Sequence, residues 1–96
     1  MKQPTLAEQM ADICLFPLGT ILATLGALDL LDRAEMNAAD LLLRHQQGDW
    51  GCVPPEDADA NIHAIIDGCR ILSSYEVLHS ERIWIITEAD RSATTL

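Results

Sequence analysis

The run Ile83-Trp84-Ile85-Ile86 constrains the fold of this chain more than any other segment, because it is apolar at every position. A strand with one solvated face alternates apolar and polar side chains. A continuous apolar run is instead typical of a strand that is covered on both faces. The run therefore predicts a central strand over residues 82–88, in which Trp84 is largely inaccessible to solvent.

The segments on either side of this strand predict its neighbours in an antiparallel sheet. Residues 70–77 alternate apolar and polar side chains and form the first strand of a hairpin. The connection Leu78-His79-Ser80-Glu81 lacks Gly. Its composition therefore favours a four-residue loop with a type I turn rather than a tight primed turn. Residues 92–96 add a third antiparallel strand after a short connection.

Capping residues and helical spacing predict short helices around this sheet. Thr5 and Asn37 are N-cap residues, Pro54-Pro55 begins a helix, and Gly48 and Gly68 end helices. The expected helices span residues 6–14, 27–36, 38–47 and about 55–67. Residues 18–24 are expected to form a short strand, with a continuous helix through this run as the alternative.

The apolar positions of these helices predict the faces that they bury. The expected inward residues are Leu28, Leu31 and Ala34 in the second helix, Leu41, Leu42 and His45 in the third, and Ile62, Ile65 and Ile66 in the fourth. The 96 residues are enough for one modest core. Residues 1–96 are therefore predicted to form a single α+β domain: a small antiparallel sheet of three to four strands packed with three to four short helices.

The charge balance indicates the kind of partner that such a domain can bind. Fifteen acidic and six basic side chains give a net charge of −9. Free nucleic acid is repelled by such a surface, whereas a basic protein is attracted to it. The alternative interpretation is that the acidity serves only solubility.

Cysteine usage and hydropathy predict a cytoplasmic protein without a membrane segment. Cys14, Cys52 and Cys69 are odd in number and form no Cys-x-x-Cys pair, which favours reduced thiols buried as small apolar groups. The apolar run at residues 15–28 is too short to span a bilayer. Acidic residues precede it where a signal peptide carries positive charge.

The residues that could carry chemistry do not match a known catalytic or metal-binding spacing. Cys52, His63, Cys69 and His79 fit no zinc-finger or zinc-ribbon pattern, and no nucleophile elbow is present. We therefore expect no catalytic residue, no metal and no cofactor. Arg91 lies between Glu88 and Asp90, which predicts structural ion pairs, with an anion site as the alternative.

Three blocks of the sequence carry a resemblance to a known family. They are Arg44-His45-Gln46-Gln47-Gly48-Asp49-Trp50-Gly51, Gly68-Cys69-Arg70-Ile71-Leu72-Ser73-Ser74-Tyr75 and residues 82–96. In this order they resemble a family of small accessory proteins common on plasmids, phages and genomic islands, often labelled plasmid-related proteins or restriction subunits. The resemblance spans residues 18–96, leaves residues 1–16 unmatched, and implies an accessory protein of a mobile genetic element.

The resemblance and the charge together lead to a functional hypothesis. We expect a non-enzymatic anti-defence protein that binds a host CRISPR or restriction effector and blocks its access to DNA. The alternative is an interaction or regulatory module that acts on plasmid or phage proteins, with a homodimer formed through the open edge of a short C-terminal strand. The acidic surface expected to bind a basic partner comprises Asp29, Asp32, Glu35, Asp40, Glu56, Asp57, Asp59 and Asp67.

Overall fold

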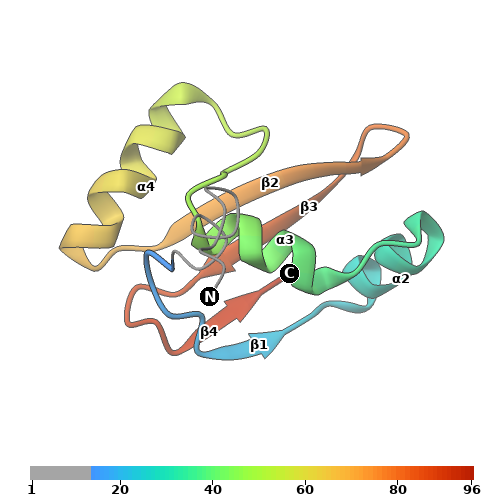
Figure 1. Ribbon diagram of the computed structural model, residues 1–96, viewed down its shortest axis with the longest axis horizontal. Helices are drawn as coiled ribbons and strands as arrows, with labels where there is room; N and C mark the ends of the chain where they lie inside the picture. The colour runs from blue at the N-terminus through green and yellow to red at the C-terminus, as the bar shows by residue number, and fades with distance from the viewer. Residues whose placement is uncertain (1–13) are drawn as a thin grey trace, which may run out of the picture.

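The computed structural model describes residues 14–96 as three helices and one four-stranded sheet (Figure 1). The elements are β1 (Thr20–Leu22), α2 (Leu25–Ala34), α3 (Ala38–Gln46), α4 (Pro55–Asp67), β2 (Ile71–Leu78), β3 (Glu81–Thr87) and β4 (Ala93–Thr95). The predicted α+β class is confirmed. The helix expected at residues 6–14 lies outside the described residues, apart from Cys14.

The sheet has the strand order β1-β4-β3-β2, so β3 is a central strand, as its sequence predicts. The pairs β2–β3 and β3–β4 are antiparallel, but β1 pairs with β4 in parallel. The sheet is therefore mixed. Since β4 lies between β1 and β3, it is not an edge strand, contrary to the expectation for the C-terminal strand, and the homodimer stays a prediction.

The hairpin between β2 and β3 is tighter than the sequence predicts. Only His79 and Ser80 separate the two strands, and both have positive φ, at 48° and 68°. Two positive φ values match a type I′ turn, whose twist suits the flanking strands. The four-residue type I loop is therefore wrong, because the twist of the strands outweighs the absence of Gly.

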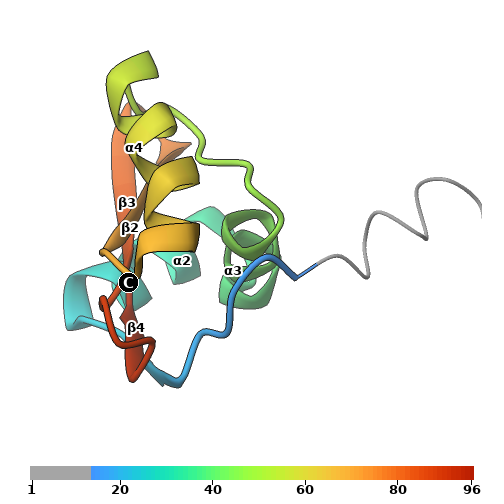
Figure 2. The same cartoon turned by 90° about the vertical axis from the view of Figure 1, so that its left-hand side faces the viewer.

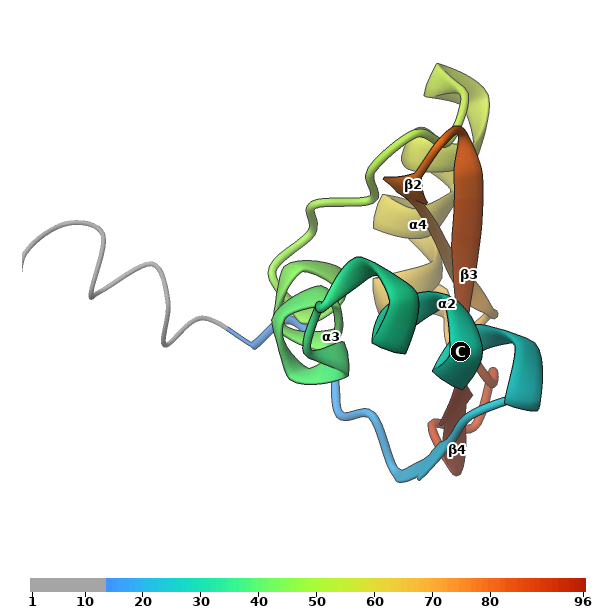
Figure 3. The same ribbon diagram turned by 90° about the vertical axis from the view of Figure 1, so that its right-hand side faces the viewer.

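The helices cover one face of the sheet and leave the other largely bare. Figures 2 and 3 show α3 and α4 on the same side of the strands, with α2 near the ends of β1 and β4. Thr24 caps α2 and Asn37 caps α3 through side-chain oxygens that accept backbone N–H bonds, as expected for Asn37. Leu28 of α2, expected to face inward, is instead half exposed. Together the two caps set the short α2–α3 hairpin against the sheet.

Two apolar clusters form the core on the covered face. The larger cluster joins α2 and α3 to the centre of the sheet, and its members include Leu31, Leu41, Tyr75 and Ile85. The smaller cluster comprises Phe16, Trp50, Ala64 and Ile71, with partly buried neighbours. Trp50 thus folds back over the end of α3, where its ring lies 6.0 Å from that of His45.

The buried face of α4 differs from the predicted one. Ile62 and Ile66 are 53% and 82% exposed, whereas Asn61 and Ala64 are buried. The reason is a pair of hydrogen bonds at the outer edge of β2. Asn61 donates from Nδ2 to the Leu72 carbonyl (2.7 Å) and accepts from the Leu72 N–H (3.0 Å). This pair turns the isoleucines away from the sheet and closes an edge that could otherwise pair with another chain.

Replacing Asn61 with Ala should lower the free energy of unfolding by about 2 to 4 kcal/mol, because it leaves a backbone donor and a backbone acceptor unpaired at a partly buried edge. Urea denaturation measures this change. Ala60→Ser on the exposed face of the same helix is the control and should cost less than about 0.5 kcal/mol. An equally small cost for Asn61→Ala would show that the amide does not hold α4 to β2.

Candidate binding surface

The residues of the Arg44–Gly51 block hold their own loop against the sheet. Arg44 forms an ion pair with Asp49 (2.7 Å), and the Tyr75 hydroxyl donates to the Asp49 carbonyl. Gly51 has a positive φ, and a Cβ there would lie 2.1 Å from the Ser74 carbonyl oxygen. The block therefore needs Gly where its backbone lies against β2.

His45 is the centre of a buried chain of hydrogen bonds. Its Nδ1 lies 2.5 Å from Ser73 Oγ and its Nε2 lies 2.9 Å from Thr87 Oγ1. Thr87 Oγ1 lies 2.7 Å from Thr94 Oγ1, which donates to the Leu18 carbonyl (2.8 Å). The side chains that these hydrogen bonds link, those of His45, Ser73, Thr87 and Thr94, are fully buried.

The chain of donors determines which nitrogen of His45 carries the proton. Thr94 has one hydroxyl proton, which it donates in a hydrogen bond to the Leu18 carbonyl. In its contact with Thr87, the Thr94 hydroxyl must therefore be the acceptor. Thr87 then accepts from His45, which places the proton on Nε2 and leaves Nδ1 to accept from Ser73. Burial favours this neutral imidazole and lowers the pKa of His45 from 6.5 to about 4.

The contact between Ser73 and His45 has the elements of a nucleophile and a base but lacks access. Ser73 has no exposed surface, and its hydroxyl proton is engaged by the imidazole. A reacting group would have to come within about 3 Å of that hydroxyl oxygen. The arrangement therefore supports a structural role for the pair in this conformation.

Arg91 also has a structural role, although its partners differ from the predicted ones. Its guanidinium donates to the carbonyl oxygens of Ala64 (2.8 Å), Cys69 (2.6 Å) and Glu88 (3.0 Å). It thus fastens the C-terminal end of α4 to the connection before β4. The expected ion pairs with Glu88 and Asp90 are wrong, since Glu88 instead pairs with Arg70 (3.4 Å).

The residues considered for metal binding are scattered over the surface. Cys14, Cys52 and Cys69 are all exposed, so the prediction of buried thiols is wrong. His63 lies on α4 and contacts the Asp59 carbonyl through Nδ1 (2.8 Å). Among residues 14–96, no three side chains of His, Cys, Asp or Glu gather closely enough to hold a metal ion. No helix in the same range is long and apolar enough to cross a membrane.

The eight predicted carboxylates are exposed but form two separate groups. Asp29, Asp32, Glu35 and Asp40 lie on or next to α2 and α3, and Glu56, Asp57, Asp59 and Asp67 lie on α4. Figure 1 shows α2 and α4 at opposite ends of the molecule. Within residues 14–96, only Asp29 of these eight forms an ion pair, with Arg33 (3.0 Å).

The bare face of the sheet exposes an aromatic side chain that the sequence predicts to be buried. Trp84 is 47% exposed, whereas Ile83 and Ile85 on either side of it are buried. The central strand thus has one covered face and one open face. Trp84 lies opposite Ser74, whose buried hydroxyl has no hydrogen-bond partner among the described residues. The inaccessible Trp84 is therefore a wrong prediction.

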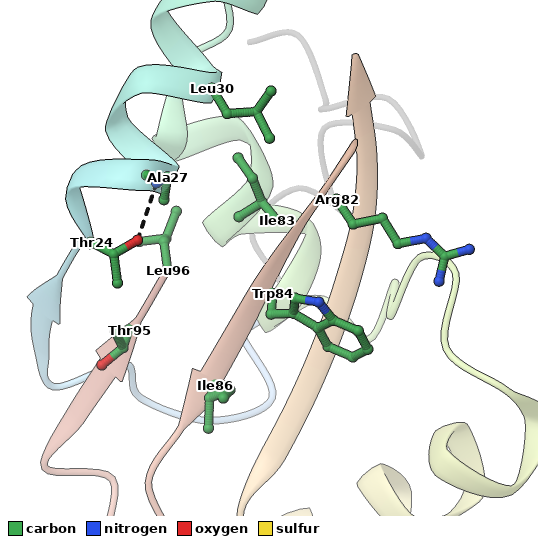
Figure 4. A pocket seen from close by; sticks show the side chains of 10 residues that line it. Thr24, Ala27, Leu30, Arg82, Ile83, Trp84, Ile86, Thr95 and Leu96 are labelled. Atoms are coloured by element: carbon green, nitrogen blue, oxygen red, sulfur yellow. Dashed lines mark hydrogen bonds between the residues drawn. The ribbon is translucent and has the colours of Figure 1, made fainter. Parts of the chain in front are cut away.

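Near Trp84 the surface is hollowed between α2 and β3 (Figure 4). The hollow has a volume of about 390 Å³ and lies between the start of α2, the end of β4 and the first half of β3. Its apolar wall includes Ala27, Leu30, Ile83, Trp84 and Leu96. This volume is within the range of about 300 to 1,000 Å³ that is usual for ligand sites. Because the residues come from three elements, no local sequence signal could have predicted it.

Comparison with protein-family models, with curated proteins and with solved structures finds no significant match for this chain. The function must therefore be argued from the surfaces described above.

The two tryptophans should respond very differently to replacement by Ala. Trp50 is 8% exposed and packs against Phe16 and His45, so Trp50→Ala should cost about 3 to 5 kcal/mol of stability. Trp84 is 47% exposed, and Trp84→Ala should cost less than about 1.5 kcal/mol. Chemical denaturation of the two variants measures the difference. Equal costs would mean that Trp84 is covered in solution.

The neutral state of His45 should make stability depend on pH. The folded pKa of about 4 lies below the ordinary 6.5, so the unfolded chain binds more protons between these values. The contribution of His45 is complete above about pH 6.5 and is lost as the pH falls toward 4, by about 3 kcal/mol in total. The free energy of unfolding, measured from pH 7 to 4.5, should fall with this slope as the pH is lowered.

Two variants assign the slope to His45. His45→Gln should be less stable at every pH but should lack most of the slope between pH 6.5 and 5. His63→Gln, on the exposed side of α4, should keep it. A wild-type stability that is flat over this interval would contradict a depressed pKa for the buried imidazole.

Proposed function

We propose that this chain is a non-enzymatic anti-defence protein of a mobile genetic element, which binds a CRISPR or restriction effector and blocks its access to DNA. One observation carries the proposal: seven of the eight surface carboxylates form no ion pair within residues 14–96. Arg33 pairs with Glu81 as well as with Asp29, and Arg44 and Arg70 pair with Asp49 and Glu88, so these three arginines leave the other seven carboxylates uncompensated. The surface therefore keeps an uncompensated negative charge that favours a basic partner.

The arrangement of the carboxylates suggests how such binding would block an effector. An enzyme that holds DNA lines its channel with Lys and Arg side chains that contact phosphates. Glu56, Asp57 and Asp59 follow one another along the exposed part of α4, where they could take the place of successive phosphates. Blocking an effector in this way needs no catalysis, in keeping with the structural roles of His45, Ser73 and Arg91. The resemblance to plasmid and phage accessory proteins supplies the biological setting.

A second candidate function is an interaction module that regulates proteins of the element itself. The observation that favours it is the open sheet face around Trp84, since an exposed aromatic residue beside an apolar hollow is typical of a protein-binding surface. This function requires no basic partner. The two candidates therefore differ in how strongly binding depends on salt.

Replacing Glu56, Asp57 and Asp59 with Lys should weaken protection against an effector while the fold persists. Exposed charges contribute little to stability, although Glu56 and Asp57 lie in the first turn of α4, where their loss should cost about 1 kcal/mol. Protection of an infecting phage or plasmid, measured in cells that carry defined CRISPR or restriction systems, should fall sharply. Association of the purified proteins should slow, and wild-type binding should weaken as salt rises.

Asp32, Glu35 and Asp40 provide the matched control, because their replacement with Lys changes the net charge equally at the other end of the molecule. If both triple variants lose protection to the same degree, net charge matters and α4 holds no specific contact. If the wild-type protein protects against none of the systems tested, the anti-defence proposal is wrong, and the regulatory function becomes the better one.

A further inference from the structure

We propose that the open face of the sheet packs against the same face of a second copy of this chain, across a two-fold axis that lies between the two sheets and runs perpendicular to their strands. The inference goes beyond the proposed function, because it needs neither an origin in a mobile element nor a basic partner. It rests on the order of the charges that β2 and β3 carry on this face and on the apolar side chains between them.

A row of mostly apolar side chains crosses the open face at the level of Ile86. The strand register places Leu72 of β2 and Thr95 of β4 beside Ile86, and Leu22 of β1 beside Thr95. Residues that pair directly across strands share a face, and Trp84 shares it because it lies two residues from Ile86. Leu22 and Trp84 are each about half exposed. An aromatic and aliphatic surface of this kind is typical of a protein contact.

Charged side chains of alternating sign flank the apolar part of β2 and β3 on the same face. At one end, Arg70 forms an ion pair with Glu88 (3.4 Å). At the other end, Glu76 lies opposite Arg82. All four lie an even number of positions from the apolar row, so the alternation of strand side chains puts them on the open face. Their charges cancel, although the net charge of the chain is −9.

This order of charges is self-complementary. The proposed axis places each strand over the same strand of the partner with its direction reversed. Arg70 then faces the partner's Glu76, and Arg82 faces the partner's Glu88. The symmetry repeats each contact, since the same patch is used on both copies. The charges of the open face therefore attract a second copy in this orientation.

The apolar side chains favour this axis over one that runs parallel to the strands. With the proposed axis, Trp84 packs on the partner's Ile86 and all four strands of the two sheets overlap. A parallel axis between β2 and β3 also brings opposite charges together. However, it sets Trp84 over the partner's Ser74 and moves β1 and β4 beyond the partner's β2, so that less apolar surface is buried.

Much of the remaining negative charge lies away from this contact. Figures 2 and 3 show α3 and α4 on the covered side of the sheet, so both helices would point outward in the dimer. β1 and β4 contain no charged residue. Facing sheets pack about 10 Å apart, and charges farther apart than about 8 Å are largely screened at physiological salt. The repulsion between the carboxylates on these helices is therefore weak across the dimer.

Sedimentation equilibrium of the full chain between about 5 μM and 1 mM tests whether the dimer forms. A reducing buffer excludes disulfides between the exposed cysteines. Two of the four strands have only three residues, so the contact is smaller than in most stable complexes, and we expect a Kd of about 10 to 100 μM. Trp84→Ala should raise the Kd at least about tenfold. The control Ile66→Ala removes an exposed apolar side chain of α4 and should not change it.

Two charge reversals test the orientation. In the dimer of Arg70→Glu, and in that of Glu76→Arg, like charges face each other at two places, and each Kd should rise at least about tenfold. An equal mixture of the two variants restores both pairs with the same total charge as a wild-type dimer. The mixture should therefore dimerise within about threefold of the wild-type Kd. Both residues are exposed, and circular dichroism checks that the variants fold.

Three results would overturn the proposal. The first is a wild-type chain that stays monomeric up to 1 mM. The second is a dimer that Trp84→Ala leaves intact, since its contact would then lie elsewhere. The third is a mixture of the two charge variants that dimerises no better than either alone, which would contradict the proposed axis. None of these results depends on protection against a CRISPR or restriction system, so the dimer and the anti-defence function are tested separately.

Discussion

The neutral imidazole of His45 holds α3 to the sheet through a buried chain of hydrogen bonds. It accepts from Ser73 on β2 and donates to Thr87 on β3, and Thr87 continues through Thr94 to the Leu18 carbonyl. One buried side chain from α3 thereby connects three strands and the segment before β1. Each donor in the chain has a single acceptor, so replacing any member leaves a buried polar group unpaired.

This chain of hydrogen bonds gives the most distinctive sequence blocks a part in holding the fold together. His45 is used inside the core, Asp49 and Gly51 hold the loop against β2, and Arg91 fastens the end of α4. The surface that remains consists of carboxylates at two ends and the open face around Trp84. The two surfaces differ in the forces that they offer: long-range attraction in one case and apolar contact in the other.

Much of the fold could be predicted from the sequence, because local signals determine it. Helix caps such as Asn37 and the apolar strand at Ile83 gave the elements and the central position of β3. The predictions were wrong where tertiary contacts determine which side chains are buried. Asn61 rotates α4 so that Ile66 is exposed, and an uncovered sheet face exposes Trp84. The exposed carboxylates could be predicted from charge alone, but their separation into two groups and the hollow depend on how distant segments meet.

Measuring the protonation state of His45 decides whether the hydrogen-bond chain runs in the direction described. Nitrogen chemical shifts of the imidazole distinguish a protonated from an unprotonated ring nitrogen, and selective labelling separates His45 from the exposed His63 and His79. We expect a proton on Nε2, a free Nδ1 and no change in either down to about pH 5, since the pKa is about 4. A His45 ring that carries its proton on Nδ1, or that titrates near 6.5, would contradict the direction of the hydrogen-bond chain and the central role assigned to it.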